Sequence, residues 1–213
     1  MSVALKTPLP SPAAEGPLLP GLVYQFTVEQ YQQMIEAGIF TANDRVELLE
    51  GWIIHKMTQN PPHAVAVDYA QEILRAMLPA AWKVREQKPI QTSDSQPEPD
   101  LAIVQGPAGR YEARHPKPSE IVLLIEVADT TLLDDRNWKG RLYARARIPV
   151  YWIINLVDGK VEVYTQPKGG KAPAYRERRD YGQEESVPLM LAGQQIGHIP
   201  VRDLLPGRTG MVK

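Results

Sequence analysis

Two acidic side chains occupy positions in predicted strands that ordinarily hold apolar residues. Asp100 begins the segment DLAIV, and Glu126 nearly ends the segment IVLLIEV. If the two segments are antiparallel neighbours, pairing Val104 with Val122 puts Asp100 opposite Glu126, with their Cα atoms about 4.5–5.5 Å apart. Two carboxylates that close in a partly buried sheet do not both ionise unaided, because like charges raise one pKa strongly. Either one carboxyl keeps its proton or a cation lies between them, and Mg²⁺ is typical of such oxygen ligands.

A lysine is predicted to join this pair from a helix over residues 133–147. At spacings of three, four and seven residues, Lys139 shares one helical face with Leu142, Tyr143 and Ala146. This apolar face is the one expected to contact the sheet, and Asp135, one turn earlier, could share the role of Lys139. The alternative is that Lys139 extends along its own stem to the surface.

A further acid, Glu47, lies in the segment VELLEG. On a half-buried strand it faces away from Val46 and Leu48, which places it either in a site or in solvent. Carboxylates, a divalent ion and a lysine together are the groups of a phosphodiesterase site. The ion would polarise the phosphate and activate a water, and Lys139 would stabilise the developing charge or orient that water.

The elements that must position these residues predict an α/β fold. A capping box at Thr27 and Gln30 starts a helix that ends at Gly38. Periodicity and turn signals then predict two short strands around Glu50-Gly51, a helix over 62–78, strands over 82–88, 99–104 and 121–127, a hairpin around Asp158-Gly159, and short strands over 174–181 and 194–201. We therefore expect a single domain, a mixed β-sheet flanked by helices over residues 23–205, between a proline-rich arm (1–22) and a C-terminal tail (206–213).

Composition limits the class of protein. The chain has 213 residues, a net charge of −1 and no Cys. The charge excludes a chain-wide basic field, and the absence of Cys excludes disulfide scaffolds, cysteine nucleophiles and iron–sulfur sites. No segment has the apolar length of a membrane helix, so we expect no membrane partner. The absence of Cys fits a reducing compartment, and we expect a cytoplasmic location.

Four segments in fixed order carry a resemblance to a known family: VELLEGWIIHKM with His63 after it, EPDLAIV, LLIEVADTTLLDDRNWKGRLYARARIP and YWIINLVDGKVEVY. From about Phe26 to Pro167 the chain resembles the Uma-two family of the PD-(D/E)xK nuclease superfamily. The resemblance implies a restriction-endonuclease-like fold and a metal-dependent endonuclease that hydrolyses DNA, with Mg²⁺ or Mn²⁺ as cofactor.

The resemblance also implies roles for single residues. Asp100 matches the aspartate of the "PD" element, and Glu126 matches the acid of the second element. The backbone carbonyl of Val127 would supply another metal ligand, and Glu47 matches an acid ahead of the core strands. The sequence departs from the superfamily pattern at Ala128, where its lysine is expected; Lys139 on the following helix would replace it.

Residues 134–147 carry a net charge of +3 and include Arg136, Arg141 and Arg145. These arginines and His63 are candidate nucleic-acid contacts, although the arginines could equally form a solvated face and His63 could serve only to start its helix. A homodimer is expected from the resemblance, because two cuts in a duplex need two sites. Two other functions stay open: a non-catalytic module that binds nucleic acid or protein, and a hydrolase of small phosphoesters.

Overall fold

The computed structural model describes residues 23–41 and 43–207 of the chain. The predicted arm (1–22) and most of the predicted tail (208–213) lie outside these described residues. The centre is a six-stranded sheet in the order β3-β4-β5-β6-β7-β8. Its strands are β3 (Trp82–Glu86), β4 (Leu101–Gln105), β5 (Ile121–Ala128), β6 (Val150–Asn155), β7 (Lys160–Lys168) and β8 (Ala174–Tyr181). Only β5 and β6 pair in parallel, so the predicted mixed sheet is confirmed.

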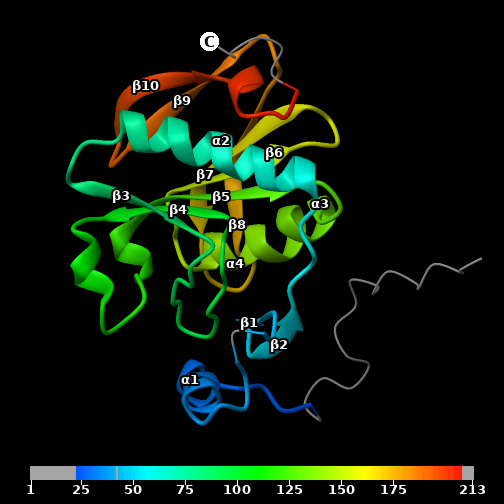
Figure 1. Ribbon diagram of the computed structural model, residues 1–213, viewed down its shortest axis with the longest axis vertical. Coiled ribbons are helices and arrows are strands. Elements are labelled where there is room, and N and C mark those ends of the chain that lie inside the picture. The colour runs from blue at the N-terminus through cyan, green and yellow to red at the C-terminus, as the bar shows by residue number, and fades with distance from the viewer. Residues whose placement is uncertain (1–22, 42, 208–213) are drawn as a thin grey trace, which may run out of the picture.

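Helices cover both faces of this sheet (Figure 1), with α2 on one side and α4 on the other. The helical elements are α1 (Val28–Glu36), α2 (Pro61–Met77), α3 (Leu132–Asp134), the π turn η3 (Asp135–Lys139), α4 (Gly140–Arg145), and the short 3₁₀ helices η1 (Ala108–Tyr111), η2 (Pro118–Glu120) and η4 (Val201–Asp203). None of the helices in the described part of the chain is long and apolar enough to cross a membrane.

Two small antiparallel sheets lie outside the central one. The hairpin β1 (Val46–Leu49) and β2 (Trp52–His55) lies near α1, and β9 (Ser186–Leu191) with β10 (Gln194–Pro200) lies beyond α2 (Figure 1). Glu50 and Gly51 join β1 to β2 with φ angles of 50° and 81°, the left-handed geometry of a tight hairpin turn. The strand β9 was not predicted, because Pro188 interrupts its alternating pattern.

β5 is the buried centre of the sheet. All eight of its residues are buried, as its continuous apolar run predicts. Leu123, Ile125 and Val127 pack into the core beneath α2, whereas Leu124 and Ala128 pack into the core beneath α4. Glu126 therefore projects to the α4 face, where an apolar residue would otherwise lie.

The register between β4 and β5 corrects one prediction. Leu101 pairs with Ile125 and Ile103 with Leu123, but a bulge then pairs Val104 with Ile121 rather than with Val122. Val122 turns instead into the core beneath α2. Because the bulge lies at the far end of the strands, the register beside the acids is still the predicted one.

The predicted helix over 133–147 is a continuous helical run with a π turn in its middle. It ends at Arg145, and Arg147 takes a left-handed φ of 60°. The π turn contains both Asp135 and Lys139, and it follows β5 after a short loop and α3. A π turn inserts one extra residue, and such turns are frequent at functional sites.

Candidate active site

A pocket of about 130 Å³ opens where β5 ends, between the start of α2, the β1–β2 hairpin and the π turn. Its acidic lining residues are Glu47, Glu98, Asp100, Glu126, Asp129, Asp134 and Asp135. Lys56 and Lys139 are among the few cations of the lining. The pocket is therefore strongly acidic, although the whole chain is almost neutral.

Asp100 and Glu126 lie at the floor of this pocket and are 7% and 2% exposed. The backbone N–H of Val127 donates to Oδ2 of Asp100 over 2.8 Å, so the first carboxylate is tied to the strand that carries the second. Tyr143 donates its hydroxyl to Oε1 of Glu126 over 2.6 Å. The structure thus brings together the two acids that the strand register predicts to be neighbours.

Lys139 points inward, as its helical spacing predicts. Its Nζ lies 3.1 Å from Oε1 of Glu126 and 3.6 Å from Oδ1 of Asp135. Asp135 is itself buried and accepts a hydrogen bond of 2.6 Å from the Thr131 hydroxyl. One ammonium group thus contacts two buried carboxylates.

Burial of these charges changes their protonation. Burial raises the pKa of Glu126 to about 8, against the opposing charge of Lys139 and with further raising effects from Asp100 and Asp135. Burial likewise raises the pKa of Asp135. Burial lowers the pKa of Lys139, but the surrounding carboxylates, Glu126 foremost, outweigh it and hold that pKa well above its usual value. The pocket therefore has too little positive charge for its acids, and it favours either a bound proton or a further cation.

Glu47 is buried in the same pocket and does not face solvent. Its Oε2 accepts a hydrogen bond of 2.9 Å from the backbone N–H of Glu98. The hairpin that carries Glu47 is held by Glu50, which accepts from Trp138 Nε1 over 3.0 Å and pairs with arginines of α4. The helix that supplies Lys139 therefore also fixes the hairpin that supplies Glu47.

His63 lies in the first turn of α2, which Asn60 caps by accepting the His63 backbone N–H over 3.0 Å. The ring Nε2 lies 3.2 Å from Oδ2 of Asp100, and the ring Nδ1 is buried without a hydrogen-bond partner in the described structure. His63 thus starts its helix and also belongs to the pocket.

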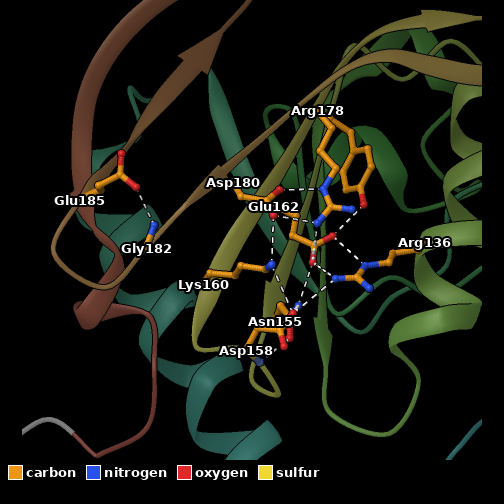
Figure 2. A network of polar contacts seen from close by, with 10 residues as sticks. Arg136, Asn155, Asp158, Lys160, Glu162, Arg178, Asp180, Gly182 and Glu185 are labelled. Carbon is orange, nitrogen blue, oxygen red and sulfur yellow. Dashed lines mark hydrogen bonds and ion pairs between the residues drawn. The ribbon is translucent and has the colours of Figure 1, made fainter.

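The three candidate arginines lie elsewhere. Arg136 points away from the pocket into a network on β6, β7 and β8, where it pairs with the fully buried Glu162 (Figure 2). Arg141 and Arg145 pair with Glu50, and Arg145 also pairs with Asp94 at 2.8 Å. The basic character of residues 134–147 is thus largely neutralised by carboxylates that are distant in sequence.

Several pocket residues were missed by the sequence reasoning. Asn60 donates to Asp129, and Lys56 pairs with Glu98 at the pocket rim. Tyr143 was placed on the inward face of its helix, but its hydrogen bond to Glu126 was not predicted. The contacts of Asn60 and Lys56 leave no signal in the sequence, because Asn60, Asp129, Lys56 and Glu98 all lie outside the helices and strands. The bond of Tyr143 joins a helix to a strand 17 positions away.

The donor set partly fits a divalent metal ion. Within residues 23–41 and 43–207, no group of three or more His, Cys, Asp or Glu side chains is arranged to hold a metal. However, the contacts of Tyr143 and Lys139 fall on one oxygen of Glu126, and those of His63 and Val127 fall on one oxygen of Asp100. Two carboxylates are what Mg²⁺ commonly takes from a protein, with water completing its shell. In chemical type, the residues present therefore fit a hard divalent ion.

The chain matches known proteins both in sequence and in fold. A family profile described as "Putative restriction endonuclease" matches residues 28–202, which extends beyond the predicted resemblance at its C-terminal end. The chain is also similar in fold to a crystal structure titled as a "putative nuclease belonging to DUF820" from Anabaena variabilis. The identity is 15% and the TM-score 0.60, with 84% of this chain and 97% of the other covered. No curated protein matches the chain.

The family match spans most of the chain and supports a nuclease-like protein. The structural match covers 84% of the chain and supports the restriction-endonuclease-like fold that the sequence predicts. The chain belongs to the Uma2 (Uma-two) family of restriction-endonuclease-like proteins.

Proposed function

We propose that this protein is a metal-dependent endonuclease of the PD-(D/E)xK type that hydrolyses phosphodiester bonds of DNA, with Mg²⁺ or Mn²⁺ as cofactor. The observation that carries the proposal is the contact of Lys139 with Glu126 in the same acidic pocket as Asp100. Such a buried cation and carboxylate are expensive to maintain for structure alone, because replacing a buried ion pair by apolar residues is often neutral or stabilising.

Asp100 and Glu126 would hold the cation through their second oxygens, with the backbone carbonyl of Val127 as a further ligand. When bound, the ion would polarise the phosphate and lower the pKa of a water. Lys139 would stabilise negative charge on the phosphate or orient the attacking water, since its ammonium lies beside Glu126. Glu47 would assist from the hairpin or contribute to a second ion.

The position of the lysine is a departure from the superfamily pattern that the fold explains. The usual place, two residues after Glu126, is Ala128, which is fully buried in the core beneath α4. A lysine there would have to displace core packing, whereas the π turn brings Lys139 to the same carboxylate from the neighbouring helix.

A homodimer belongs to the same proposal, because one pocket of this kind cleaves one strand and a double-strand cut needs two pockets. The products of plasmid cleavage distinguish a homodimer from a monomer. A dimer would linearise plasmid in step with nicking, whereas a monomer would accumulate nicked circles first.

Plasmid cleavage tests the proposal. The wild-type protein with Mg²⁺ or Mn²⁺ is expected to convert supercoiled plasmid to nicked or linear forms, and to lose this activity in EDTA. Glu126→Gln and Asp100→Asn are expected to be inactive, while Glu112→Gln, an exposed acid outside the pocket, keeps wild-type activity. DNA binding with no metal-dependent cleavage would leave the non-catalytic module as the function.

A further inference from the structure

A second pocket, of about 450 Å³, lies along β3, the edge strand of the central sheet. It is formed by the end of α2, by β3 and by η1. In contrast to the acidic pocket, none of its lining residues is acidic, and four are cationic: Arg75, Lys83, Arg85 and Lys88. A concave surface with this charge favours a ligand with more than one negative charge.

These four cations are unpaired. Within the described part of the chain, none of them forms an ion pair with a carboxylate, whereas Arg110 in η1 and Arg114, which lies over Tyr111, both pair with Glu120. Because the lining of the pocket holds four cations and no acid, it carries a local excess of positive charge in a chain whose net charge is −1. This excess indicates that the neutralising group comes from outside the molecule.

Arg85 shows most clearly that a partner is missing. Its Nε is buried without a hydrogen-bond partner in the described structure, and its only side-chain bond is a long one of 3.5 Å to the carbonyl of Pro89. Its guanidinium lies over the ring of Tyr111, 5.3 Å from the ring centre, which holds it in place at the pocket. A guanidinium that is held in place at the lining of a pocket is the group that recognises phosphate oxygens best.

The pocket also lies beside β3, which pairs with β4, the strand that follows Asp100. Lys83 pairs with Val104 and Arg85 with Ala102, so these two cations project from the same face of the sheet as Asp100. Strand geometry places the Cα of Arg85 about 8 Å, and that of Lys83 about 14 Å, from the Cα of Asp100. Measured along the axis of a duplex, which rises about 3.4 Å per nucleotide of each strand, this separation is about two to four nucleotides.

We infer that the β3-edge pocket is a second phosphate-binding site, which holds a backbone phosphate of the nucleic-acid strand a few nucleotides from the bond presented to the acidic pocket. This inference rests on the proposed nuclease function and extends it. It gives the negatively charged substrate an anchoring point that the acidic pocket itself does not provide.

Fluorescence anisotropy with a labelled single-stranded oligonucleotide in EDTA tests the inference without cleavage. The double variant Lys83→Gln/Lys88→Gln changes two exposed residues, so it is expected to fold normally. It is expected to bind roughly tenfold more weakly at physiological salt and to reduce the slope of log K against log salt by about 1.4. Arg85→Lys, which keeps the charge but loses the planar guanidinium group, is expected to weaken binding too.

The matched control is Lys168→Gln/Lys171→Gln, which removes the same charge from exposed residues at the opposite edge of the sheet. Equal weakening in this control, or none in Lys83→Gln/Lys88→Gln, would overturn the inference. Unlabelled oligonucleotide and inorganic phosphate are compared as competitors at equal phosphate concentration. If inorganic phosphate competes as well as the oligonucleotide, the pocket is a site for free phosphate and not for a nucleic-acid strand. Equal competition by polyglutamate would show a site for acidic protein segments.

The active-site variant Asp100→Asn separates this inference from the proposed function. It is expected to keep full oligonucleotide affinity while losing cleavage. If the wild-type protein never cleaves DNA but binds it through Lys83 and Lys88, the nuclease proposal fails and the pocket is still a nucleic-acid site. If it cleaves DNA and the lysine variants behave as wild type, only the second site is wrong.

Discussion

The ammonium of Lys139 and the carboxyl group of Glu126 lie 3.1 Å apart in a place where a pair of apolar side chains would be more stable. Glu126 is 2% exposed, and both Tyr143 and Lys139 contact the same carboxylate oxygen. Taking a charge out of water costs several kcal/mol, and burial accordingly raises the pKa of Glu126 to about 8, while the surrounding carboxylates keep Lys139 charged. The presence of these two side chains in the core is understandable if they act on a substrate.

Lys139→Met is expected to lower the single-turnover rate of plasmid nicking by about 10²–10³-fold, because it removes one positively charged donor from the site. Affinity for Mn²⁺ should not fall and is expected to rise, because the ammonium no longer competes for Glu126. Nicking kinetics and a Mn²⁺ titration measure the two effects. A variant with wild-type rate would show that Lys139 takes no part in the reaction.

Glu120 gives a prediction for stability against pH. Hydrogen bonds from Arg114, with a further one from the backbone N–H of Lys117, lower its pKa to about 2. A lowered pKa stabilises the folded state above the ordinary value of about 4.5, and this stability is lost as the pH falls from there towards 2. At pH 7, Glu120→Gln is expected to cost about 1–2 kcal/mol, or roughly 2–8 °C in Tm.

Thermal denaturation of both proteins at several pH values measures this difference. It is expected to be constant from pH 7 to 5 and to shrink below pH 4.5. A difference that stays the same down to pH 3 would mean that the charge of Glu120 contributes nothing.

At the scale of elements, the π turn directs neighbouring side chains to opposite sides of the helix. Asp135 and Lys139 turn towards the acidic pocket, whereas Arg136 turns towards β7 and binds Glu162 (Figure 2). Glu162 is fully buried, and Asn155 and Tyr164 also donate to it, over 2.8 Å and 2.7 Å. The network therefore anchors the turn from the side opposite the pocket.

Glu162→Gln is expected to destabilise the protein by on the order of 3 kcal/mol, because it leaves the guanidinium of Arg136 without its main partner. This corresponds to a Tm lower by roughly 6–12 °C in calorimetry. The exposed Glu177→Gln on the neighbouring strand β8 is the control, with an expected change within about 0.5 kcal/mol. Equal Tm values for the two variants would show that the buried network does not anchor the turn.

At the scale of the whole molecule, local patterns predicted most of the fold. The apolar run of β5, the turn at Glu50-Gly51 and the capping box at Thr27 are each determined by a few adjacent residues. The helical spacing of Lys139 was enough to predict its direction because the helix packs on the sheet by its apolar face.

Features that depend on distant partners could not be predicted in the same way. The bulge at Val122 follows from packing on both faces of β5, and the ion pairs of Arg136, Arg141 and Arg145 join residues up to 95 positions apart. The burial of Glu47 depends on Glu98, which reaches it from a loop. Such long-range arrangements leave no period or spacing in the sequence.

Cation binding at Asp100 and Glu126 would couple the site to the stability of the whole chain. An ion bound only by the folded state stabilises it by about 2.7 kcal/mol at one hundred times its Kd. Because burial raises the pKa of Glu126 to about 8, binding at pH 7 should also release a proton. The affinity for the cation should therefore fall as the pH is lowered from about 8, because protons then compete for Glu126.

Isothermal titration calorimetry measures cation binding and proton release most directly. The metal-free protein is titrated with Mn²⁺ in two buffers of different ionisation enthalpy. The wild-type protein is expected to bind Mn²⁺ with proton release at pH 7, and Asp100→Asn/Glu126→Gln is expected not to bind. Absence of binding to the wild-type protein, or equal binding to the double variant, would contradict the account.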